Sequence, residues 1–223
     1  MITIAQSVEE IVGSTPFVEE ALGKGLLNLS AYARAIRSQI QEKHLKTVTV
    51  ASLVMALKRL QPRCRGRHVA LYDLVKLRDI TVESSFVEYT FRNTPTLNAL
   101  QRALIDLTEE QDLCMNFAQG IHESTLVVHH VLEKDVDRLA KKEQVLSKIP
   151  RLSLITIRLP ADTVETPGVY YPILKALAWA GINFIEIISV SSELTIIFRD
   201  KDVDRAFSVI KGLIGDSGAA DRD

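Results

Sequence analysis

Hydrophobic residues along the first 68 positions recur at the three- to four-residue spacing of amphipathic helices. The pattern predicts one helix over Glu9 to Leu22, a second capped by Ser30, and a third capped by Thr49 that ends before Pro62. Together these segments predict a helical domain over residues 1–68. The second and third helices follow each other as the two members of a helix-turn-helix pair do.

From Asp79 onward the hydrophobic period changes to two, which is typical of strands. Two blocks follow, residues 77–147 and 151–215, and each repeats the order strand, helix, strand, strand, helix. The pentapeptide Lys134–Arg138 recurs as Lys201–Arg205 at the same point of each block. Such a repeat predicts one small sheet-and-helix unit that is built twice, and therefore an α+β fold.

The two blocks differ in their predicted strands. The first has one strand more than the repeat requires, and the second lacks a strand after its last helix. We therefore expect Asp79 to Glu83 to pair with the sheet of the second block, and Ser84-Ser85 to turn or bulge this stretch. The tail, residues 216–223, is small and charged, which predicts disorder.

The composition is that of an ordinary globular protein, with 47% hydrophobic and 25% charged residues among 223. The formal net charge of −1 provides no overall attraction for nucleic acid, so any basic surface has to be local. Acids stand at positions 9 and 10, where a secretory signal needs an apolar core, and no apolar run is long enough to span a bilayer. We therefore expect a cytoplasmic protein that has no membrane partner.

The sequence contains no phosphate-binding loop, nucleophile elbow or set of metal ligands at a recognisable spacing. Its acids and histidines do not cluster. His129 and His130 are adjacent in a predicted strand, so their side chains point to opposite faces. We expect no catalytic residue, no metal and no cofactor, and a binding or regulatory role in place of an enzymatic one.

The loop that leads into the helix of the second block has the features of a site for a carboxylate. Gly168 follows Thr166-Pro167, and without a Cβ it lets a ligand approach the backbone. N–H groups at a helix start can hold a carboxylate because that end of the helix is partly positive. Glu186 and Glu193 offer charge-assisted hydrogen bonds to an α-ammonium group. These features describe an amino-acid pocket; a simple strand-to-helix turn with two exposed acids is the alternative.

Three stretches of the second block stand out together: Thr166–Val169, Gly181–Glu186 and Ser191–Thr195. Through them the block resembles an ACT domain, and in particular the regulatory region of aspartate kinases. Asp79–Ser85 is similar to the strand that begins the other half of such a pair. The resemblance covers about residues 77–214. It implies two ferredoxin-like βαββα(β) repeats packed side by side, without the kinase catalytic domain.

ACT domains commonly bind a small effector, often an amino acid, at the interface between two copies. The first block has Thr96 where the second has Gly168, and it has no match to the Ser-Ser-Glu turn, so one of two potential sites keeps the pattern. The resemblance implies a non-catalytic regulatory protein that binds an amino acid and forms a homodimer. The implied contacts are Thr166, Gly168, Val169, Tyr170, Ile185, Glu186, Ser192 and Glu193.

A second function stays open from the N-terminal residues. The stretch from Lys58 to His68 contains no acid, and its cations can neutralise phosphates. If these helices bind DNA through Arg63, Arg65 and Arg67, the chain is a transcription regulator whose repeats sense the effector. A charged segment after a helix is also common without any partner.

Overall fold

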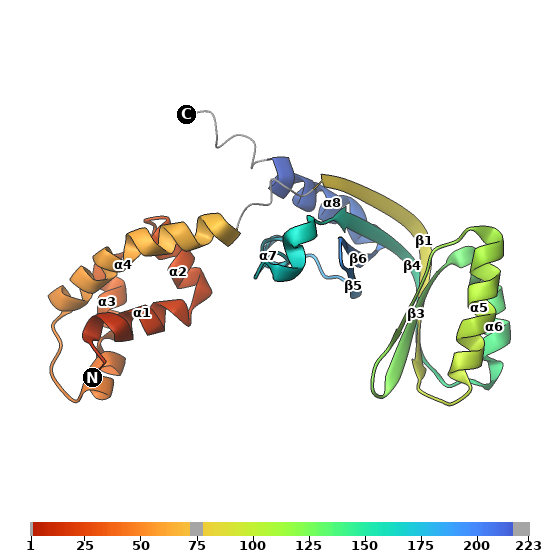
Figure 1. The fold of residues 1–223 in the computed structure, drawn as a ribbon, viewed down its shortest axis with the longest axis horizontal. Coiled ribbons are helices and arrows are strands. Elements are labelled where there is room, and N and C mark those ends of the chain that lie inside the picture. The colour runs from red at the N-terminus through yellow and green to blue at the C-terminus, as the bar shows by residue number, and fades with distance from the viewer. Residues whose placement is uncertain (1, 72–77, 216–223) are drawn as a thin grey trace. The chain divides into compact units, whose positions relative to one another are not determined.

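The protein is described by a computed structural model that covers residues 2–71 and 78–215. The chain divides into two compact units, Met1–Asp73 and Leu74–Asp223 (Figure 1). The first unit is helical in its described part. Its helices are α1 (Ile4–Gly13), α2 (Pro16–Gly23), α3 (Leu29–His44) and α4 (Val50–Leu71). One hydrophobic core joins all four, and its fully buried members include Val8, Leu22, Ile40, Leu53 and Leu57.

The helix predicted over Glu9 to Leu22 is wrong as a single element, because α1 and α2 divide it. Thr15 breaks the run, with φ −128° and ψ 82°. The ring of Pro16 disfavours helical backbone at the residue before it, and proline is well suited to open the next helix. Helix α1 also begins earlier than predicted, at a capping box formed by Thr3 and Gln6.

The predicted cap of α4 is confirmed, whereas its predicted end is wrong. Thr49 Oγ1 accepts a hydrogen bond from the backbone N–H of Ser52 at 3.2 Å. The helix does not stop before Pro62 but runs through it. Proline removes one backbone donor, and Leu60 and Cys64 pack into the same core on either side of it. In α3, Asn28 and not Ser30 is the cap, since Asn28 Oδ1 accepts from the N–H of Ala31 at 3.0 Å.

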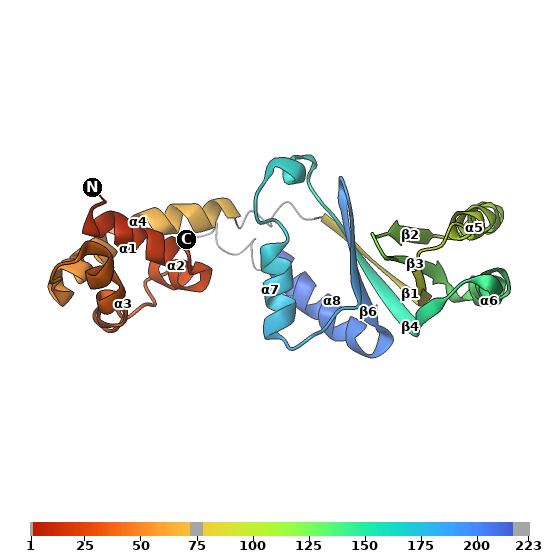
Figure 2. The same ribbon diagram turned by 90° about the horizontal axis from the view of Figure 1, so that it is seen from below.

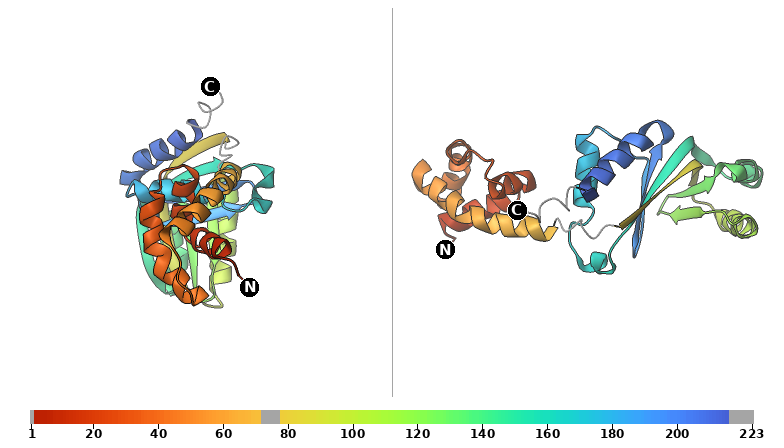
Figure 3. Two further views of the ribbon diagram at one scale, coloured as in Figure 1. Left: turned by 90° about the vertical axis from the view of Figure 1, so that its left-hand side faces the viewer. Right: turned by 90° about the horizontal axis from the view of Figure 1, so that it is seen from above.

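The second unit is built on one six-stranded antiparallel sheet with the strand order β2-β3-β1-β4-β6-β5. Its strands are β1 (Arg78–Arg92), β2 (Met115–Gln119), β3 (Glu123–His129), β4 (Val145–Arg158), β5 (Glu186–Val190) and β6 (Glu193–Arg199). Its α-helices are α5 (Leu97–Gln111), α6 (Glu133–Leu139), α7 (Tyr171–Trp179) and α8 (Asp200–Gly215). Figures 2 and 3 show α5 and α6 on one side of the strands and α7 and α8 on the other.

The repeat predicted from the sequence is confirmed in the topology. The second part of β1 leads to α5, β2, β3 and α6, and the second part of β4 leads to α7, β5, β6 and α8 in the same order. The duplicated pentapeptides lie in α6 and α8. The fold is α+β, with N-terminal helices followed by two side-by-side repeats that share one sheet.

Strands β1 and β4 are long because each of them serves both repeats. Phe91 to Val87 of β1 pair with Val145 to Pro150 of β4 in the first half, and Ile80 to Glu83 pair with Ile157 to Leu154 in the second half. The predicted pairing of Asp79–Glu83 with the second block is thereby confirmed. The first part of β4 supplies the fourth strand of the first half in the same way.

The charged run from Asp135 to Leu146 has the spacing of one helix, but a helix of that length is wrong. Helix α6 ends at Leu139, a 3₁₀ turn follows over Ala140–Lys142, and β4 begins at Val145. Hydrogen bonding along the edge of β1 outweighs the local helical spacing of these residues.

Both long strands bulge where the two halves meet. Ser85 has φ 71° and Arg151 has φ 58°, and the register between β1 and β4 shifts at these points. The predicted bulge at Ser84-Ser85 is confirmed. A bulge bends its strand and resets the alternation of side chains. Val87 and Tyr89 accordingly pack with α5 and α6, whereas Ile155 packs with α7 and α8.

The second unit has a third apolar cluster beside the two under its helices. It lies on the face of the sheet that the helices do not cover, and we call it the seam cluster. Its buried members are Phe86, Val127, Leu152, Leu154 and Ile197, and Ile149, Ile185 and Ile188 pack against them. These residues come from both halves, and none belongs to a helix. Since the helices cover the other faces (Figure 2), the two half-sheets bend toward each other and bury this cluster between them.

Tyr89 ties α6 to the long strands. It is buried, and its Oη donates a hydrogen bond to Asp137 at 2.8 Å. Lys148 of β4 lies 2.9 Å from Asp137 and from Glu133, and 4.9 Å from the centroid of the Tyr89 ring. Burial, assisted by the Asp137 carboxylate, raises the pKa of Tyr89 to about 12 although Lys148 acts in the opposite direction. Asp137 of the duplicated pentapeptide therefore has a structural task.

The bend of the sheet predicts a large effect of one leucine in β4 and a small effect of another. Leu152→Ala removes a fully buried member of the seam cluster and should lower the free energy of unfolding by about 2–5 kcal/mol. Leu146→Ala is the matched control, because Leu146 lies in the same strand and is 39% exposed. We expect its cost to stay below about 1 kcal/mol in chemical denaturation followed by circular dichroism. Equal costs would contradict a buried seam.

Candidate functional site

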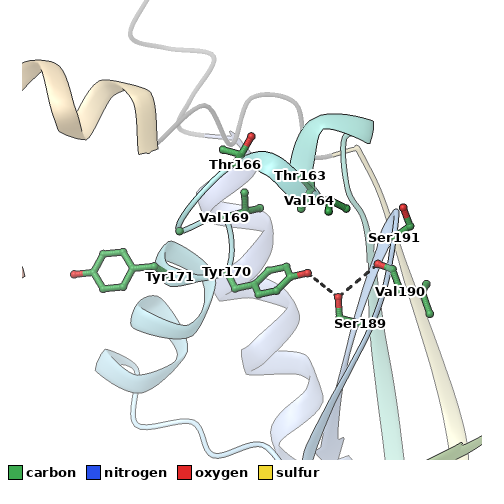
Figure 4. A pocket seen from close by; sticks show the side chains of 10 residues that line it. Thr163, Val164, Thr166, Val169, Tyr170, Tyr171, Ser189, Val190 and Ser191 are labelled. Carbon is green, nitrogen blue, oxygen red and sulfur yellow. Dashed lines mark hydrogen bonds between the residues drawn. The ribbon is translucent and has the colours of Figure 1, made fainter.

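A hollow of about 510 Å³ lies where the loop before α7 faces the hairpin of β5 and β6 (Figure 4). This volume falls in the range of small-molecule pockets. The loop contributes seven lining residues and the hairpin three. They are Thr163, Val164, Thr166, Gly168, Val169, Tyr170 and Tyr171, with Ser189, Val190 and Ser191.

The loop is shaped by short-range hydrogen bonds and one glycine. The N–H of Thr166 donates to the carbonyl of Thr163 at 3.1 Å, which closes a 3₁₀ turn over Ala161–Glu165. Gly168 has φ +82°, a left-handed conformation that L-residues rarely adopt. The N–H of Tyr171 then donates to the carbonyl of Gly168 at 3.1 Å, and α7 starts. Tyr170 and Tyr171, where α7 starts, therefore line the hollow.

One hydrogen bond joins the two sides of the hollow. The hydroxyl groups of Tyr170 and Ser189 lie 2.6 Å apart, and Figure 4 shows both side chains pointing toward each other. Tyr170 comes from the loop and Ser189 from β5. The bond holds the loop and the hairpin together. Each hydroxyl can instead bind a ligand if the Tyr170–Ser189 hydrogen bond breaks.

Thr163 is a polar group that lacks a partner in this wall. The residue is 8% exposed, and within the described residues its Oγ1 makes no hydrogen bond. A buried hydroxyl without a partner is costly, so a rearrangement of the loop that lets a ligand atom pair with it would be stabilising. The described lining otherwise offers hydroxyls, backbone groups and valines, and no charged side chain.

The residues implied by the ACT resemblance are divided between two places. Thr166, Gly168, Val169 and Tyr170 line the hollow together, as the sequence interpretation requires of one site. Ser192 does not line it; its carbonyl accepts a hydrogen bond from Leu159 at 2.7 Å.

The other three implied residues also lie outside the hollow. Ile185 packs against the seam cluster, and the carboxyl group of Glu186 interacts with that of Glu88. Glu193 begins β6, opposite Val190 and Arg158 in the strand ladder. The two acids suggested for an α-ammonium group thus do not meet at the loop.

Sequence reasoning missed Ser189 and Thr163. Strand alternation carries a signal for Ser189, because Ile187 packs on the core beneath α7 and the residue two positions later shares its face. Thr163 has no such signal, since its position depends on the 3₁₀ turn.

In the first unit, Arg63 forms an ion pair with Glu9 at 2.8 Å. The side chains of Arg65 and Arg67 lie outside the described residues. The nucleic-acid alternative stays a prediction.

Within residues 2–71 and 78–215, no three His, Cys, Asp or Glu side chains come together as a metal ion requires. Over the same described ranges, no helix has the length and apolar character needed to cross a membrane.

With this geometry in place, comparison with solved structures identifies the fold. The regulatory subunit of aspartate kinase from Thermus thermophilus, in its ligand-free form, superposes with a TM-score of 0.50 at 12% sequence identity. The match covers 61% of this chain and 97% of that subunit. The fold of the second unit is that of an aspartate kinase regulatory region.

Two structures of aspartate kinases show the same likeness. The enzyme of Clostridium acetobutylicum matches with a TM-score of 0.51 at 17% identity, over 62% of this chain and 35% of the enzyme. The enzyme from Synechocystis matches with a TM-score of 0.51 at 15% identity, over 62% of this chain and 27% of the enzyme. No protein-family model and no curated protein matches the sequence. At these identities the likeness establishes the fold alone.

The left-handed backbone at Gly168 gives a test of the loop. Gly168→Ala should lower the free energy of unfolding by about 1 kcal/mol, because a Cβ strains this conformation. Gly212→Ala is the control, since Gly212 lies in α8 with no atom within 4 Å of an added Cβ. There alanine should stabilise by about 0.5–1 kcal/mol. Thermal unfolding of both variants should therefore shift in opposite directions; two shifts of the same sign would contradict the strained loop.

Proposed function

We propose that the protein is a non-catalytic regulatory module that binds an amino acid in the hollow beside α7. One observation carries the proposal: four residues expected at such a site, Thr166 and Gly168 to Tyr170, come together around a hollow with a buried, unpartnered hydroxyl. The regulatory fold of the second unit agrees with this role. Cytoplasmic location and a homodimer, both expected from the sequence, belong to the same proposal.

The hollow suits the two ends of an amino acid in different ways. The backbone N–H groups of Gly168 to Tyr170, which lie just before α7 at its partly positive end, and the Thr163 hydroxyl can hold the α-carboxylate. The hydroxyls of Tyr170 and Ser189 can accept from the α-ammonium group once their mutual bond is released. Val164, Val169 and Val190 provide an apolar surface for the side chain. Because the described lining has no charged side chain, we expect neutral amino acids to bind better than basic or acidic ones.

Binding regulates a partner when the ligand prefers one of two arrangements of the protein. The Tyr170–Ser189 bond joins the two walls, so a ligand that replaces this bond changes the relative position of α7 and β5. This movement is the first step of the regulation that we propose.

Calorimetric titration with the twenty amino acids tests the proposal, and Thr163→Val shows whether the hollow is the site. Valine keeps the shape of threonine and removes the hydroxyl. The loss of one hydrogen bond should weaken binding about 3–10-fold. The stability of the free protein should be unchanged or higher, because the hydroxyl has no partner there.

Thr125→Val in β3 is the matched control, since Thr125 is half-buried in the other half of the sheet and does not line the hollow. It should leave the affinity unchanged. Absence of binding across the panel would refute the proposed function. Binding that Thr163→Val and Thr125→Val leave equally strong would place the amino acid elsewhere.

A further inference from the structure

Glu88 is a carboxylic acid in an apolar place. It lies in β1 between Val87 and Tyr89, whose side chains pack under α5 and α6, so it points to the opposite face. There it is 6% exposed, and its register partners are Val127 of β3 and Ile149 of β4, both of which belong to the seam cluster. Within the described residues its Oε2 has no hydrogen-bond partner. A charge at such a position is strongly disfavoured.

The group that faces Glu88 is a second carboxylic acid, Glu186 of β5. Strands β1 and β5 are separated by β4 and β6, which corresponds to about 14 Å along a flat sheet. The two carboxyl groups nevertheless lie close enough to share a hydrogen bond. The bend that brings the half-sheets together is therefore the same feature that brings the two acids together.

The environment favours one proton on this pair. Burial, the charge of Glu186 and the hydrogen bond to Glu186 raise the pKa of Glu88 to about 7. Burial also raises the pKa of Glu186, whereas the hydrogen bond from Glu88 lowers it. Glu88 is thus the acid that keeps the proton and donates to the Glu186 carboxylate. Among the described residues only Glu186 shifts the pKa of Glu88 beside burial. The titratable group of β3 that faces the seam is His129, which packs against Phe86, and burial lowers its pKa.

We propose that one proton shared by Glu88 and Glu186 closes the seam between the half-sheets, and that its loss loosens the seam. With the proton present, the pair is a single negative charge with an internal hydrogen bond. Without it, two carboxylates face each other between apolar side chains, and they repel. The seam then responds to pH near neutrality, independently of any ligand beside α7.

The direction of the effect on stability follows from proton binding. Below the ordinary glutamate value, the folded and the unfolded chain are both protonated at this position. Between that value and pH 7 the folded chain keeps a proton that the unfolded chain has lost, so stability falls as pH rises. Above pH 7 both states have lost it and the contribution is gone.

Two measurements on the full chain test the proposal. Carbon-13 NMR of the glutamate side-chain carboxyls should find Glu88 titrating well above the ordinary range. Thermal unfolding between pH 5 and 8 should show the wild type losing roughly 5–10 °C more than Glu88→Gln, since glutamine imitates the protonated acid at every pH. Glu109→Gln, at an exposed position of α5 away from the seam, should keep the wild-type slope.

A third measurement reports on the seam itself. At pH 8, backbone amides of β5 should exchange with deuterium faster in the wild type than in Glu88→Gln, while the amides of α5 exchange equally in both. Comparison at one pH cancels the intrinsic dependence of exchange on hydroxide.

Glu186→Gln provides an independent variant if Glu88→Gln folds poorly. Its side-chain amide carries no charge and can donate a hydrogen bond to the Glu88 carboxylate, so the titration midpoint of Glu88 should fall. An ordinary titration midpoint for Glu88, or parallel pH slopes for the wild type and Glu88→Gln, would overturn the proposal. Equal β5 exchange in both proteins at pH 8 would overturn it as well.

Discussion

The pairing of β1 with β4 is the constraint on which the second unit depends. Each strand gives one part of its length to the first repeat and the other part to the second. The bulges at Ser85 and Arg151 change the direction of both strands at the crossing point. Because the bend occurs there, the helices lie on the two outer sides and the remaining faces of the half-sheets meet (Figure 2). The apolar cores, the seam cluster and the acid pair all follow from this one antiparallel ladder.

Strand β5 connects the two features that we consider functional. Its five residues alternate between the faces of the sheet. Ile187 and Ser189 face α7, and Ser189 reaches the hollow; Glu186 and Ile188 face the seam. A ligand that displaces β5 at Ser189 therefore acts on the same short strand that carries Glu186. Within the described residues β5 is an edge strand that pairs with β6, so fewer strand hydrogen bonds oppose its displacement than for an inner strand.

Local signals were sufficient for much of the fold. The duplicated pentapeptide, the period-two strands and the cap at Thr49 depend on residues close in sequence, and the structure contains them as predicted. Val145 and Leu146 were misread as the end of a helix because their strand partner, β1, lies more than fifty positions earlier. Pro62 was misread because the packing of α4 in the core outweighs one lost hydrogen bond.

The candidate site also contains residues whose positions follow from the local sequence and residues whose positions depend on distant partners. Thr166 to Tyr170 form one continuous loop, so a motif found in sequence arrives intact in space. Glu186 was assigned to the same site from the resemblance, but its position depends on the bend of the sheet. Glu88 escaped attention because a polar residue alternating with Val87 and Tyr89 is normally solvent-exposed. Its burial requires a second half-sheet, and a pattern within one strand contains no information about that cover.

The shared long strands have a consequence for the history and the integrity of this architecture. Each repeat is completed by part of a long strand, β1 or β4, that continues into the other repeat. A chain with a single repeat would therefore have an open sheet edge. Two such chains could each pair one strand with the sheet of the other, as in a domain-swapped dimer. In the present chain the two repeats are joined covalently, and the same strand exchange occurs within one polypeptide. Its linkage removes the dependence on concentration that a swapped dimer would have, and it frees each half to diverge in sequence.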